Sequence, residues 1–123
     1  MLAYIALGGL AGTLARYGLQ GWVQERAGGA FPSGTLAVNL AGSLLLGFLM
    51  RYAMGSTVLS PETRAGLTIG FCGAFTTMST FSYESTRLLA DGEYWPAALY
   101  IGGTMLGCLV AVLVGASVAG RLL

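Results

Sequence analysis

The stretch GFCGAFTTMSTFSYE, residues 70–84, decides how the rest of this chain is interpreted. It lies inside an apolar segment of membrane-spanning length, yet it concentrates side chains that carry a hydroxyl group. These are Thr76, Thr77, Ser79, Thr80 and Ser82. Gly70 and Gly73 precede all of them, and glycine weakens a helix. Irregular backbone at membrane depth is tolerated only where it is buried in protein or lines a polar cavity, so this stretch is the candidate functional site.

Composition assigns the chain to the membrane proteins. Of its 123 residues, 55% are hydrophobic and 9% are charged, whereas about 25% of residues are charged in an average soluble domain. The net charge of +1 provides no basic surface for nucleic acid, so we expect no such partner. The sequence has no histidine, no embedded pair of acids and no nucleophile beside a base, so we do not expect an enzyme.

Apolar segments long enough to cross a bilayer, about 20 residues each, occur four times. They cover residues 2–22, 31–52, 62–89 and 94–119. The sequence therefore predicts an all-α membrane protein with one four-helix domain, residues 1–123. Ser60 and Pro61 form a typical start for the third segment. That segment is too long for one straight crossing, so we expect a break near residues 73–79, at mid-membrane, that leaves two half-helices.

Small and polar residues recur at four-residue spacing in the other segments. Gly8 and Gly12 have the spacing that lets two membrane helices approach closely. Asn39 lies in a polar stripe, where it could bond across a helix interface or line a pore. Tyr100 and Thr104 share one face of the fourth segment. For Arg16, near the end of the first span, the sequence leaves open a contact with lipid headgroups or a role in drawing anions into a vestibule.

The arginines are balanced between the two sides of the predicted membrane. Four spans place both termini and the second connection on one side, and the other two connections on the opposite side. The first side has Arg51, Arg64 and Arg121; the second has Arg16, Arg26 and Arg87. This balance gives the positive-inside rule no preference, so we expect insertion in both orientations. Four short helices barely enclose a pathway, and we therefore expect an antiparallel homodimer with its two-fold axis in the membrane plane.

The chain resembles the Fluc/CrcB family of fluoride channels over nearly its whole length. The resemblance rests on three motifs in order: GGLAGTLARY at residues 8–17, GTLAVNLAGS at 34–43 and GFCGAFTTMSTFS at 70–82. It implies a dual-topology antiparallel homodimer with two narrow pathways, in the inner membrane of a prokaryotic cell. Such a protein would let fluoride leave the cytoplasm passively.

The resemblance also implies roles for single residues. Backbone carbonyls of Gly73 and Thr76 would hold a structural sodium ion, Na+, at the dimer centre. The residues that the resemblance implies for the fluoride pathway are Asn39, Met78, Ser79, Thr80, Phe81, Tyr100 and Thr104, with Glu84 at the vestibule. We add Phe75 to them, because the edge of its ring is weakly positive. The family usually has phenylalanine where this chain has Met78, and methionine has no ring quadrupole. We expect conduction to persist at an altered rate.

Two other classes of protein remain as alternatives. A small multidrug-type exporter also has four helices and forms dimers, but it needs a carboxylate embedded in the membrane. The only acid in the third segment's polar half is Glu84, near its end. In a non-conducting subunit of a membrane assembly, the polar side chains would serve only to join helices. Uncharged donors such as Asn39 and Tyr100 favour the channel, because they can replace the water around a small anion without trapping it.

Overall fold

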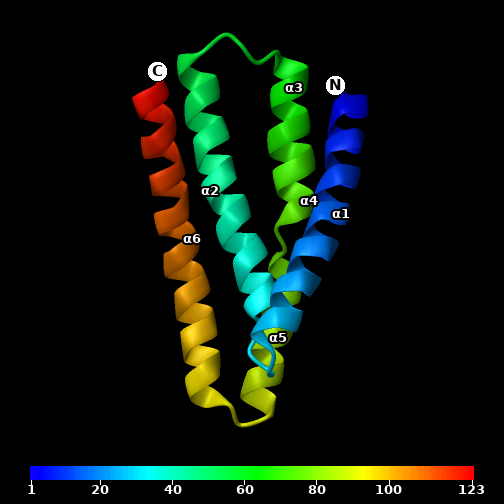
Figure 1. Ribbon diagram of the computed structural model, residues 1–123, viewed down its shortest axis with the longest axis vertical. Helices are drawn as coiled ribbons and strands as arrows, with labels where there is room; N and C mark the ends of the chain where they lie inside the picture. Colours follow the sequence, from blue (N-terminus) through cyan, green and yellow to red (C-terminus); the bar gives the residue numbers. More distant parts are fainter.

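The computed structural model describes all 123 residues, and they form helices without a single strand. The elements are α1 (Leu2–Ala27), α2 (Ser33–Gly55), α3 (Pro61–Ala65), η1 (Gly66–Cys72), α4 (Gly73–Phe75), α5 (Met78–Ala90) and α6 (Tyr94–Leu122). The segments α3, η1 and α4 continue as one rod, and α5 follows after a short interruption (Figure 1). The all-α prediction is confirmed.

Both ends of the chain lie at the same end of the molecule (Figure 1). The connection between α2 and α3 lies there too, whereas the connections after α1 and after α5 lie at the opposite end. Two of the helices, Ser33–Gly55 and Tyr94–Leu122, are long and apolar enough to cross a membrane. Helix α1 continues to Ala27, beyond the apolar segment predicted to end at residue 22, and stops before Gly28 with its positive φ of 66°. The additional residues of α1 are polar or charged for the most part, so the helix continues beyond its apolar segment.

Glycines bring pairs of helices into direct backbone contact. A methyl group on Gly8 would overlap the carbonyl of Gly66, and one on Gly12 would overlap the carbonyl of Phe71, so α1 lies directly against η1. The predicted close packing at Gly8 and Gly12 is confirmed. Gly47 makes the equivalent approach between α2 and α6, where a methyl group would overlap the Val112 carbonyl.

The third helical segment is interrupted at Thr76 and Thr77, which have extended backbone angles. Thr76 has φ −97° and ψ 161°, and Thr77 has φ −150° and ψ 120°. Just before this point, η1 is a π-helix of seven residues, and π segments are frequent at functional sites. Helix α5 then starts with Thr77 as its N-cap, because the Thr77 hydroxyl accepts a hydrogen bond of 3.2 Å from the Thr80 amide.

The molecule has little interior of its own. Only 21 of the 123 residues are buried. The largest apolar cluster contains four buried residues, Phe81, Leu88, Ala97 and Tyr100, and joins α5 to α6. Large apolar side chains instead cover the surface, and on α6 Leu106 and Leu113 are 68% and 67% exposed. Such a surface suits lipid or another protein chain rather than water.

Candidate functional site

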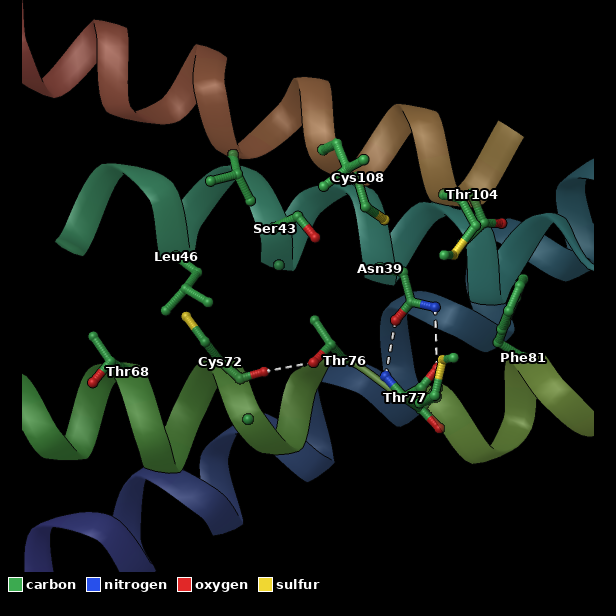
Figure 2. A pocket seen from close by; sticks show the side chains of 16 residues that line it. Asn39, Ser43, Leu46, Thr68, Cys72, Thr76, Thr77, Phe81, Thr104 and Cys108 are labelled. Carbon is green, nitrogen blue, oxygen red and sulfur yellow. Dashed lines mark hydrogen bonds between the residues drawn. The ribbon is translucent and has the colours of Figure 1, made fainter. Parts of the chain in front are cut away.

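A pocket of about 450 Å³ opens beside the interruption, between α2, the interrupted segment and α6 (Figure 2). We call it the central pocket. Six of the residues predicted for the functional site line it: Asn39, Gly73, Thr76, Met78, Phe81 and Thr104. No acidic or basic side chain is among its sixteen lining residues. Its polar groups are therefore an amide, hydroxyls, thiols and backbone atoms.

Asn39 of α2 holds the interruption in place. Its Oδ1 accepts a hydrogen bond of 2.8 Å from the Thr77 amide, and its Nδ2 donates one of 3.1 Å to the Thr77 carbonyl (Figure 2). The side chain is 8% exposed. A carboxamide nitrogen carries two hydrogens, so one N–H of Asn39 is left over after these two bonds. The contact across a helix interface, one of the two roles considered for Asn39, is present.

Thr104 of α6 is buried in the central pocket without a hydrogen-bond partner. The residue is 5% exposed, and its Oγ1 is the only buried side-chain oxygen or nitrogen that lacks a partner. Leaving a buried polar group unpaired costs about 1–3 kcal/mol. Such a group in a native protein calls for an explanation, and a ligand or water that enters the pocket would supply the missing partner.

The backbone carbonyls at the end of α4 divide into two sets. The Cys72 carbonyl accepts hydrogen bonds from the amide and the hydroxyl of Thr76, at 3.1 and 3.0 Å. The Gly73 and Thr76 carbonyls accept none, because the amides that would reach them in a continuous helix bond elsewhere. The Thr77 amide donates to Asn39, and the Thr80 amide donates to the Thr77 hydroxyl. Both free carbonyls belong to residues that line the central pocket.

Aromatic side chains connect the central pocket with the end of the molecule where α5 and α6 meet. Phe81 lines the pocket, and its ring centroid lies 5.2 Å from that of Tyr100. Tyr100 is fully buried, and its hydroxyl donates a hydrogen bond of 3.0 Å to Glu84 Oε1. Glu84 lines a second pocket, of about 490 Å³, together with Gln20, Arg87 and other residues near the end of the molecule.

The other predicted residues do not line the central pocket. Phe75 is 7% exposed and stacks on Phe71, with 5.5 Å between ring centroids. Ser79 and Thr80 lie beside the Thr77 hydroxyl, which is 3.4 Å from Ser79 Oγ and donates a bond of 3.1 Å to Thr80 Oγ1. These hydroxyls therefore shape the first turn of α5.

Arg16 makes a contact that the sequence did not indicate. From the half-buried middle of α1, its Nε donates a hydrogen bond of 3.0 Å to the Ala74 carbonyl, at the end of α4. Sequence reasoning also missed Thr77 as the N-cap of α5. A threonine three residues before Thr80, next to the expected break, was the available signal for that cap. For the Ala74 contact, nothing in the sequence gives a signal.

The fold and the site together define a small all-helical membrane protein with an uncharged pocket beside an interrupted helix. The chain belongs to the CrcB family, since the sequence model described as "CrcB-like protein, Camphor Resistance (CrcB)" matches residues 3–116. The predicted membership of the Fluc/CrcB family is confirmed.

The chain is similar to several proteins named fluoride-specific ion channel FluC. The protein from Geotalea daltonii is 48% identical over 116 residues, which is 94% of each chain. That from Geotalea uraniireducens is 49% identical over 119 residues, or 97% of this chain and 96% of the relative. That from Geobacter sulfurreducens is 50% identical over 118 residues, or 96% and 95%. These names describe a channel and not an enzyme, in agreement with the expectation from composition.

Proposed function

We propose that this chain forms a fluoride-selective passive channel, multi-pass in the inner membrane of a prokaryotic cell. The observation that carries the proposal is the pair of unused donors in the central pocket, the hydroxyl of Thr104 and one N–H of Asn39. Fluoride is a small anion that accepts strong hydrogen bonds, so a pore must replace its hydration water with donors. Donors without fixed charge bind the ion strongly enough to admit it and weakly enough to release it.

A route for the ion follows from the arrangement of these groups. Fluoride would pass the pocket donors and the ring edge of Phe81, then the Tyr100 hydroxyl, and leave beside Glu84 at the second pocket. The close packing of Phe81 on Tyr100 and the Tyr100–Glu84 hydrogen bond support this order. Met78, 66% exposed on the rim of the central pocket, would take the place of a second ring. Ser79, Thr80 and Phe75, which do not line the central pocket, would hold the residues of the pathway in position.

The channel would be an antiparallel homodimer with two pathways, each chain crossing the membrane four times. Exposed apolar residues beside the central pocket support a partner on that face, since Met105 and Leu109 are 51% and 64% exposed. The charge argument for dual insertion changes slightly. Arg16 contacts the interruption and therefore no longer counts with the arginines at its end of the molecule. That end then has two arginines, Arg26 and Arg87, each in the last turn of its helix, and the opposite end has three. A difference of one arginine is still a weak orienting signal.

A structural sodium ion fits the free carbonyls at the interruption. Gly73 and Thr76 offer backbone oxygens that no amide uses, and carbonyls at the ends of half-helices coordinate sodium in membrane proteins. Gly73 is exposed, so a second copy related by a two-fold axis could bring an equivalent pair of oxygens. The ion would supply a positive charge at the dimer centre, at mid-membrane.

The alternatives have less support. A proton-coupled exporter needs a carboxylate in its central site, and the central pocket contains none. In a purely structural subunit, an unpartnered Thr104 hydroxyl would only reduce stability. The unpartnered hydroxyl therefore supports a channel over a structural subunit.

The test is efflux from liposomes that contain the purified protein, recorded for fluoride, chloride and a quaternary ammonium cation, each with and without a proton gradient. We expect electrogenic fluoride efflux alone. Thr104→Val, which removes the hydroxyl and keeps the shape, is expected to slow fluoride about tenfold, the loss of one hydrogen bond to a charged group, without lowering stability. Thr86→Val on the exposed face of α5 is the matched control. Proton-coupled cation transport, or no flux, would refute the proposal.

A further inference from the structure

The contact between Arg16 and the interruption is built into the packing of two helices. Four residues before Arg16, Gly12 lies directly against the Phe71 carbonyl, where no side chain would fit. One helical turn along α1 from Gly12 therefore corresponds to about one turn from Phe71 along η1 and α4 of the same chain. This register brings the Arg16 Nε to 3.0 Å from the Ala74 carbonyl.

The same contact accounts for one of the backbone carbonyls around the interruption. The Cys72 carbonyl is used by Thr76, and the Ala74 carbonyl is used by Arg16. Gly73 and Thr76 are left without a partner. Without Arg16, Ala74 would add another free acceptor next to Gly73, and α4 would lose its only side-chain hydrogen bond with α1.

We propose that Arg16 is a positioning residue for the central cation: its Nε–H occupies the Ala74 carbonyl and holds the Gly73 and Thr76 carbonyls in the orientation that binds a sodium ion. This inference rests on the proposed sodium site. It assigns Arg16 a role through its hydrogen bond, which differs from a role through its charge in a vestibule. A guanidinium charge beside a cation site is unfavourable for the cation by itself, so the hydrogen bond is the part that helps binding.

Two substitutions separate the hydrogen bond from the charge. In Arg16→Gln the side-chain nitrogen follows the same three carbons as the arginine Nε, so it can donate to Ala74 without a charge. In Arg16→Met the side chain is as long as that of glutamine, but it has neither a hydrogen-bond donor nor a charge. If the hydrogen bond matters, glutamine preserves sodium binding and methionine does not. If only the charge matters, the two substitutions have the same effect.

The measurement is the midpoint of thermal unfolding of the full-length protein in detergent, titrated with sodium chloride at constant ionic strength against a large organic cation. An ion that binds only the folded state raises this midpoint as its concentration increases. We expect half-saturation by sodium within about twofold of the wild type for Arg16→Gln, and at about tenfold higher sodium for Arg16→Met, as expected for one lost hydrogen bond. The midpoint without sodium reports general damage separately.

Three outcomes would overturn the inference. Arg16→Met could lower the midpoint at zero sodium and keep the wild-type sodium response, which would make Arg16 merely structural. Arg16→Gln could weaken the response as much as Arg16→Met, which would assign the effect to charge. The wild type could show no sodium response, in which case the sodium site itself fails. If Arg16→Met does not fold, Arg16→Lys replaces it. Lysine keeps the charge but moves the donor by one bond, so glutamine should preserve sodium binding better than lysine, and the reverse order refutes the inference.

Discussion

Replacing Asn39 by leucine should destabilise the protein by removing the two hydrogen bonds that hold the interruption. Leucine has a similar volume, so the main change is the loss of the Oδ1 acceptor and the Nδ2 donor, at 2.8 and 3.1 Å from the Thr77 backbone. Each such bond contributes about 0.5–1.5 kcal/mol in soluble proteins and about 0.6 kcal/mol between membrane helices. The Thr77 amide and carbonyl would in addition be left unpaired. We expect a loss of about 2 kcal/mol in the free energy of unfolding.

The assay is reversible unfolding in mixed micelles with increasing dodecyl sulfate, followed by circular dichroism at one fixed protein concentration. The concentration must be fixed because the stability of a dimer depends on it. Ser43→Ala is the matched control, since Ser43 lies on the same helix and lines the same pocket. Its effect should stay below about 0.5 kcal/mol. If Asn39→Leu were as stable as this control, the hydrogen bonds to Thr77 would not be what holds the interruption.

Three further substitutions test other parts of the structure. Gly12→Ala should force α1 away from η1 and lower the free energy of unfolding by about 1–3 kcal/mol in the same assay. Gly103, which has open space around it, is the control, and Gly103→Ala should be neutral or slightly stabilising. Equal effects of the two substitutions would contradict the close approach of α1 and η1. Thr77→Val should cost about 1 kcal/mol through loss of the α5 cap, and an effect no larger than that of Thr86→Val would argue against the cap. Met78→Phe should change the rate of fluoride efflux from liposomes without abolishing it. If the wild type gave no fluoride efflux while Met78→Phe did, the expectation that conduction persists with methionine at this position would be wrong.

Patterns local in the chain were the most predictable from sequence. Apolar segments gave the helical class, and Ser60 caps α3 as expected, with its hydroxyl 3.1 Å from the Thr63 amide. Gly8 and Gly12 indicated a close helix contact because the absence of a side chain has one main use on a membrane helix. None of these predictions required knowledge of which helices are neighbours.

Contacts between residues far apart in the chain were less accessible. Periodicity assigned Asn39 to a polar face, but its partner is 38 residues away, and Arg16 bonds to a residue 58 positions away. A face can be read from spacing, whereas the depth at which it meets another helix depends on packing. Phe75 shows a related difficulty. It follows the π-helix η1, which has more residues per turn than an α-helix, so its direction could not be inferred from regular helical spacing.

The backbone contact between α1 and η1 has a consequence for how this protein can vary. At Gly8 and Gly12 main-chain atoms of one helix lie against main-chain atoms of the other, with no side chain between them to adjust. A shift of α1 by one residue would place a larger neighbour, such as Leu7 or Thr13, where only hydrogen fits. Insertions or deletions before residue 16 should therefore be tolerated near the N-terminus and not between Gly8 and Arg16. The number of residues between Gly8 and Arg16 therefore determines where along α1 the interruption lies.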